Sequence, residues 1–118
     1  MHRNTMHKDE RAGIPPGMMH LLILNTLSRG PLHGYAIAQE IKRRSDEVLQ
    51  VEEGSLYPAL QRMLAKGWVD AEWVPVGPKR RTRVYSLTAE GRRQLETELS
   101  AFDRVTRAIV RVIQTAEA

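Results

Sequence analysis

Cysteine is absent from the 118-residue sequence, and aromatic side chains make up only 5% of it. The lack of cysteine excludes disulfide bonds, thiolate metal ligands and cysteine nucleophiles. With so few aromatic rings, the core has to consist mainly of aliphatic side chains, and a hydrophobic fraction of 42% is sufficient for that. The length fits one domain of ordinary size.

Long apolar runs are also missing. The longest one extends from Met18 to Leu24, is interrupted by His20, and is too short to cross a bilayer. Residues 1–11 are largely polar and lack the apolar stretch of a signal peptide. We therefore expect a cytoplasmic protein that has no membrane partner.

Signatures of catalysis and of metal or cofactor binding are lacking as well. The sequence has no glycine-rich phosphate loop, and its four histidines show no metal-ligand spacing. The adjacent carboxylates of Glu52 and Glu53 point apart on either a helix or a strand, so they do not form a catalytic pair. We expect a protein that is not an enzyme and that needs no cofactor.

Positive charge is what the sequence does contain. The net charge is +4, which is compatible with nucleic acid, an anionic membrane surface or plain solubility. The basic residues are densest in residues 76–83, which hold no acidic side chain. The basic residues of this segment are Lys79, Arg80, Arg81 and Arg83.

Hydrophobic periodicity predicts a mainly α-helical fold with one small β-hairpin. Helices are expected over residues 18–28, 34–44 and 55–66, strands over 68–74 and 82–87, and a long helix over 89–115. Ser55 and Thr88 are the expected N-caps of the third and the last helix, and Pro58 then falls in a first turn. Residues 45–53 are expected to be less regular, with strained or extended backbone.

This order of elements is that of a winged helix-turn-helix. In that fold the third helix enters the major groove of DNA and the hairpin, or wing, lies over the adjacent backbone. We divide the chain into an N-terminal tail (1–16), a DNA-binding domain (17–88) and a C-terminal dimerisation helix (89–118). The basic segment would form the tip of the wing; a solvated turn that protects an edge strand is the alternative.

The exposed face of the third helix is predicted to carry Ser55, Tyr57 and Gln61. Tyr57 can donate its hydroxyl to a phosphate, and the amide of Gln61 can pair with an adenine edge. The alternatives are simple capping for Ser55 and core packing for Tyr57. Arg62 is either a phosphate contact or a solvated residue.

Contacts outside the third helix are predicted at the second helix and the wing. Tyr35, at the start of the second helix, would contact a phosphate or pack on the first helix. Lys79, Arg80, Arg81 and Arg83 would neutralise phosphates, although residues that alternate along a strand cannot all four face one surface. For Trp73 we favour a hydrophobic plug where the wing joins the last helix over a place in the wall of a ligand cavity.

The last helix has an apolar stripe too long for a small body to cover. We expect its uncovered part to pack on a second copy, giving a homodimer that reads an inverted repeat in double-stranded DNA. The predicted dimerisation residues are Leu95, Leu99, Phe102, Val105, Ile109, Val112 and Ile113.

Three segments resemble the PadR family of bacterial transcriptional regulators. They are residues 30–37 (GPLHGYAI), residues 51–60 (VEEGSLYPAL) and residues 85–91 (YSLTAEG), with Gly67-Trp68-Val69 between the last two. The compact branch with a single C-terminal helix fits best. This resemblance implies a winged-helix fold, a dimer built on the last helix, repression of a nearby promoter, and release by a small aromatic or cationic effector.

Two other functions fit the sequence less well. A winged helix used only as a protein–protein interaction module predicts an uncharged or acidic wing, unlike the basic segment at 76–83. A membrane-surface helix over 89–115 is disfavoured because its polar face carries several acidic residues, including Glu96 and Glu98.

Overall fold

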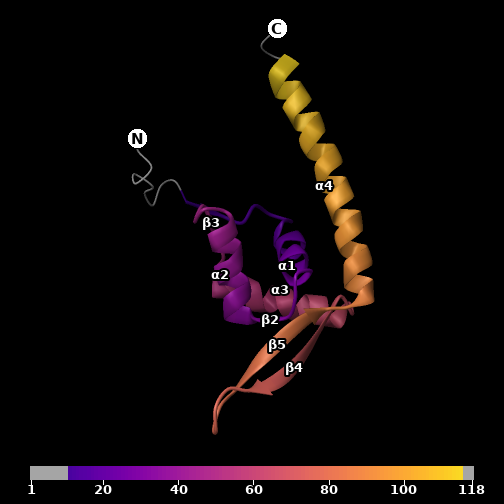
Figure 1. The fold of residues 1–118 in the computed structure, drawn as a ribbon. Helices are drawn as coiled ribbons and strands as arrows, with labels where there is room; N and C mark the ends of the chain where they lie inside the picture. Colours follow the sequence, from indigo (N-terminus) through magenta and orange to yellow (C-terminus); the bar gives the residue numbers. More distant parts are fainter. Residues whose placement is uncertain (1–10, 116–118) are drawn as a thin grey trace.

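The computed structural model describes residues 11–115. It confirms the mainly helical fold class and the predicted order of the long elements (Figure 1). In chain order the elements are β1 (Ala12–Gly13), α1 (Met19–Leu27), β2 (Leu32–His33), α2 (Gly34–Arg44), β3 (Leu49–Gln50), α3 (Glu53–Ala65), β4 (Val69–Pro75), β5 (Arg81–Leu87) and α4 (Ala89–Thr115).

The core lies between α1, α2, α3 and the base of the β4–β5 hairpin. Nearly all of its side chains are aliphatic, as the low aromatic content predicts; Tyr85 is the one aromatic ring among the buried residues of 11–115. The largest fully buried side chains are Ile23, Leu24, Leu27, Ile37, Leu56, Leu60, Met63 and Val69.

A three-stranded antiparallel sheet, in the order β2–β5–β4, lies against the helices. The β4–β5 hairpin is the wing, and it extends away from the helical body (Figure 1). Its turn is closed by a hydrogen bond of 2.8 Å from the Val76 N–H to the Arg80 carbonyl, with Gly77 at a φ of 92°. The third strand, β2, was not expected, because two residues are too few to show a strand pattern.

Part of the segment predicted as an N-terminal tail contacts the body of the protein. Ala12 and Gly13 pair in parallel with Leu49 and Gln50, so this part of the tail is held against the body. The expectation of strained and extended backbone over 45–53 is confirmed: β3 is extended, and the left-handed region is occupied at two residues, Asp46 (φ 53°) and Glu47 (φ 67°). Residues 1–10 lie outside the described part of the chain.

Helix α3 begins two residues before the predicted start. Glu52, not Ser55, is its N-cap, and the N–H of Ser55 already donates to the Glu52 carbonyl at 3.0 Å. The predicted capping role of Ser55 is therefore wrong, and Pro58 lies in the second turn instead of the first. A serine hydroxyl is typical of an N-cap, which is why Ser55 is predicted as one. The helix begins earlier because Glu53 and Gly54 also adopt helical backbone.

Helix α4 begins where predicted. The Thr88 hydroxyl accepts a hydrogen bond of 3.0 Å from the Gly91 N–H and donates to the carbonyl of Gly67 at 2.6 Å, which ties the helix start to the end of α3. The helix has 27 residues and runs well past the helical body (Figure 1). Among residues 11–115 no helix has the length and apolar character that a membrane span requires.

Candidate nucleic-acid interface

Helix α3 separates an apolar face from a polar one. Its buried residues are Leu56, Ala59, Leu60 and Met63. The predicted contact residues Ser55, Tyr57, Gln61 and Arg62 are all exposed. The helix therefore presents hydroxyl, amide and guanidinium groups to solvent while its other face anchors it in the core. That these groups contact DNA stays a prediction.

Tyr57 is fixed against the start of α2. A Cβ atom on Gly34 would lie 2.7 Å from both the ring Cε1 and the hydroxyl oxygen of Tyr57, so the ring rests on a glycine that leaves room for it. Burial raises the pKa of the Tyr57 hydroxyl, and the Glu53 carboxylate acts in the same direction. The hydroxyl thus stays protonated near neutral pH and is able to donate. Tyr35, one residue beyond Gly34, is 58% exposed and not part of the core.

The wing carries basic side chains that have no acidic partner. Lys79, Arg80 and Arg81 are exposed, and none of them forms an ion pair within residues 11–115. Arg81 and Arg83 lie opposite Pro75 and Trp73 in the antiparallel register, on one face of the ribbon. Lys79 and Arg80 lie in the turn, and that the four cations cannot all face one surface stays a prediction.

The favoured placement of Trp73 is wrong. Its side chain is 55% exposed in the middle of β4, and it does not plug the junction with α4. The guanidinium carbons of Arg81 and Arg83 lie 5.1 Å and 5.7 Å from its ring centroid. The sequence gives no clear signal of this stacking, because the register of the hairpin decides which residues of the two strands lie opposite each other.

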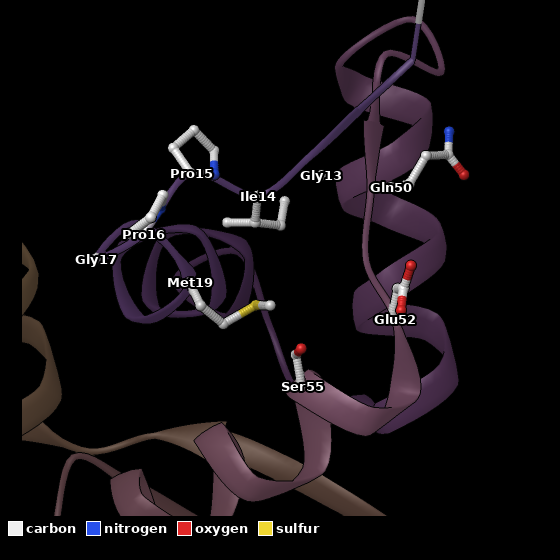
Figure 2. Close-up of a pocket in the computed structure, with 9 residues that line it drawn as sticks. All are labelled: Gly13, Ile14, Pro15, Pro16, Gly17, Met19, Gln50, Glu52 and Ser55. Carbon is white, nitrogen blue, oxygen red and sulfur yellow. The ribbon is translucent and has the colours of Figure 1, made fainter. Parts of the chain in front are cut away.

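A cleft of about 320 Å³ lies beside the start of α3 and was not foreseen. Figure 2 shows the N-terminal segment crossing above it, with Met19 on one side and Ser55 on the floor. Its rim carries Gln50 and Glu52, so a carboxylate faces the opening and disfavours an anion there. The other lining residues are Gly13, Ile14, Pro15, Pro16 and Gly17.

The apolar stripe of α4 is covered only at its beginning. Leu95 is 7% exposed and belongs to the core of its own chain, so its assignment to a dimer contact is corrected. The exposed fractions then rise along the helix, from 42% at Leu99 to 68% at Val112. The other exposed members of the predicted set are Phe102, Val105, Ile109 and Ile113.

Two connected clefts lie between α1 and α4. The first has a volume of about 330 Å³ and is lined by Met18, Leu21, Leu22, Leu49, Leu99 and Phe102, together with Pro15 and Asn25. The second has a volume of about 290 Å³ and shares Met18, Leu21 and Phe102, but it is also lined by Glu98, whose Oε2 accepts a hydrogen bond of 2.7 Å from the Gln94 Nε2. The two clefts offer an apolar surface with a negative charge at one edge.

His20 lies where α1, α3 and α4 meet. Its ring meets Trp68 edge-on, with the ring centroids 5.7 Å apart. Its Nε2 is buried and has no hydrogen-bond partner among the described residues. Burial lowers the pKa of His20, Arg62 and Lys66 lower it further, and Glu98 acts in the opposite direction.

We expect acid to destabilise the fold through His20. Since its pKa in the folded chain lies below the ordinary value of 6.5, the unfolded chain takes up the proton first. The contribution of His20 is complete above pH 6.5 and is lost as the pH falls through the folded-state pKa. His20→Phe keeps a ring against Trp68 and cannot titrate. Between about pH 7.5 and 5.5 the melting temperature should fall more steeply in the wild type than in this variant; parallel curves would contradict the assignment.

The described residues contain no cluster of acidic, histidine or cysteine side chains that could hold a metal ion. His2 and His7 lie outside the described part, so the expectation that they bind no metal is not tested by the structure.

Comparisons with known proteins agree with this arrangement. The family model of the "transcriptional regulator PadR-like family" matches residues 23–97. A transcriptional regulator of Mycobacterium tuberculosis is 30% identical over 105 residues, which are 89% of this chain and 90% of that protein. An uncharacterised 37.1 kDa protein in transposon Tn4556 of Streptomyces fradiae is 41% identical over 86 residues, or 73% of this chain, but this region is only 23% of that protein's length.

Among solved structures, Bacillus subtilis PadR in complex with operator DNA superposes with a TM-score of 0.66 at 26% identity. The match covers 72% of this chain and 48% of that one, so the chain spans about half the length of that relative. The family match extends over the second part of α1, all of α2, α3 and the wing, and the start of α4. The chain therefore belongs to the PadR-like family of transcriptional regulators.

Proposed function

We propose that this regulator binds an inverted-repeat operator in double-stranded DNA as a homodimer and represses the adjacent promoter. The observation that carries the proposal is the pairing of an exposed polar face on α3 with a wing whose cations lack acidic partners. The operator complex of Bacillus subtilis PadR, a protein of similar fold, supports it. Such a protein acts where the chromosome is, which in a bacterium is the cytoplasm.

In this proposal α3 enters the major groove. Gln61 and Arg62 reach base edges or the adjacent phosphates, and the exposed hydroxyl of Ser55 donates to a phosphate. Tyr57 donates to a phosphate from a ring that Gly34 holds in place. Tyr35 contacts the backbone beside it from the start of α2. The wing then places Lys79, Arg80 and Arg81 along the neighbouring phosphates.

Dimerisation is supported by the exposed stripe on α4. Without a partner, the six exposed apolar side chains of the stripe would face water from Leu99 onward along a helix of about 40 Å. A second copy related by a two-fold axis buries the same residues on both chains and places two α3 helices on the same side of the DNA. An operator with two-fold symmetry follows from this arrangement, and occupation of both half-sites excludes other proteins from the promoter.

We further propose that a small aromatic or cationic effector releases the DNA by binding in the connected clefts between α1 and α4. The clefts are of a size that small ligands occupy. Their apolar walls suit an aromatic ring, and Glu98 at the edge suits a positive charge. Because Phe102 lies in both clefts and on the exposed stripe, a ligand there would shift the dimer contact and with it the spacing of the two α3 helices.

Removing charge from the wing tests the DNA contact. Each phosphate that a cation neutralises adds about 0.9 to the slope of log K against log salt, and the proposed homodimer carries two wings, so Arg80→Ala/Arg81→Ala should reduce the slope by about 3.6 and weaken binding most at low salt. The matched control is Lys42→Ala/Arg43→Ala, which removes the same charge at the end of α2 remote from the wing (Figure 1). Fluorescence anisotropy with the operator duplex measures both. Equal slopes in the two variants would mean that the wing does not contact phosphates.

A further inference from the structure

The wing carries one large aromatic side chain that its own fold does not require. Trp73 is 55% exposed, and it lies beyond the part of β4 that packs on the helices. Leaving so much indole surface in water is unfavourable for an isolated domain. An exposed tryptophan on a two-stranded ribbon is therefore a candidate contact residue.

Two arginines hold this indole from the neighbouring strand. Arg83 lies directly opposite Trp73 in the register and Arg81 is two residues away, so all three side chains share one face of the ribbon. Their guanidinium carbons lie 5.7 Å and 5.1 Å from the ring centroid, which is within cation–π range. The Nε of Arg83 is buried and has no hydrogen-bond partner within residues 11–115. The stacking thus fixes two cations. Neither of them forms an ion pair with a carboxylate of residues 11–115.

This face of the ribbon points to the side where α3 lies. Side chains alternate along a strand, so Trp73 is on the same face as Ala71 and Val69, and Arg83 on the same face as Tyr85. Val69 and Tyr85 are buried in the core beneath the helices. The indole and the two guanidinium groups therefore continue, beyond the helical body, the face of the sheet that packs on that body.

A flat apolar ring with two fixed cations beside it offers the groups that one repeating unit of a DNA backbone requires. A deoxyribose offers an apolar surface, and the phosphates on either side of it offer one negative charge each. We propose that Trp73 packs against a deoxyribose of the DNA strand that the wing follows, while Arg81 and Arg83 bind the two flanking phosphates. This inference rests on the proposed DNA-binding function and adds to it a sugar contact by Trp73, a residue outside the predicted set of DNA contacts.

The first test separates a direct sugar contact from an indirect effect on the arginines. Trp73→Leu keeps a strand-compatible apolar residue and every charge. It should weaken operator binding roughly tenfold through the apolar surface that no longer becomes buried, with the salt slope unchanged. Weaker binding with a slope reduced by about 3.6, which is two phosphate contacts in each chain of the dimer, would show that Trp73 only positions the two arginines, which would overturn the sugar contact. Val74→Ala, on the opposite face of β4, is the control and should bind as the wild type does.

The second test observes the indole directly. The chain has two tryptophans, Trp68 and Trp73, so in a Trp68→Phe variant all tryptophan emission comes from the wing. Saturation with operator duplex should quench this emission and shift it to the blue. Unchanged emission at saturation, together with wild-type affinity in Trp73→Leu, would overturn the inference while leaving the DNA-binding function intact. Failure of the wild-type chain to prefer its operator over a scrambled duplex would instead overturn both.

Discussion

Gly91→Ala is expected to be the most destabilising glycine-to-alanine change in the protein. A Cβ at this position would lie 2.1 Å from the carbonyl oxygen of Trp68 and 2.7 Å from the Cδ1 of Leu87. The first obstacle is backbone, so it cannot turn aside as a flexible side chain would. The start of α4 has to move away from the base of the wing, which should cost about 3 kcal/mol.

Thermal unfolding followed by circular dichroism measures this effect. For a domain of this size we expect the melting temperature to fall by roughly 10–15 °C. The matched control is Gly54→Ala in α3, another helical glycine, where an added Cβ meets no atom within 4 Å. That change should be neutral or should stabilise the fold by up to about 1 kcal/mol, because alanine is the better helix former. If both variants have the same melting temperature, the close approach of α4 to Trp68 is not a feature of the folded protein.

Charge in the apolar stripe of α4 is expected to abolish the dimer and, with it, tight operator binding. Ile109 and Val112 are 53% and 68% exposed in the single chain. Ile109→Glu/Val112→Glu would bring four carboxylates together in the proposed two-fold interface, where they would repel one another and lose hydration. Because a dimer binds its second half-site as an intramolecular step, its loss should lower operator affinity by on the order of 100-fold or more.

Analytical ultracentrifugation separates this effect from a loss of folding. Ser100→Glu/Gln114→Glu adds the same charge to the opposite face of α4 and should leave the dimer in place. The stripe variant should sediment as a folded monomer with an unchanged circular dichroism spectrum. A wild-type chain that is monomeric at micromolar concentration, or a stripe variant that stays dimeric, would contradict the proposed interface.

Strong periodic patterns made most of the fold predictable. The apolar stripes of α1, α2 and α3 fixed which faces are buried, and Thr88 marked the start of α4 through its hydroxyl. The resemblance to PadR regulators is confirmed by the family model. Members of this family are transcriptional regulators, so the expectation that the chain is not an enzyme is confirmed as well.

The features that could not be predicted are those that depend on residues meeting from distant parts of the chain. The strands β1, β2 and β3 have two residues each and form only where a neighbouring strand offers its edge. The early start of α3 arises because Glu53 and Gly54 continue its helix toward β3, although Ser55 has the better capping side chain. The stacking of Trp73 under two arginines follows from the hairpin register. Leu95 was assigned to a partner because its pattern is that of the stripe, while the fold places it in the core.

The most direct test of operator recognition is fluorescence anisotropy of the purified wild-type protein across a salt series. One duplex carries the DNA upstream of the protein's own coding sequence, and the other carries the same bases in scrambled order. The proposed function predicts binding about 1,000-fold tighter to the native duplex at physiological salt, with affinity falling steeply as salt rises. Equal affinity for the two duplexes, or no binding even at low salt, would contradict it.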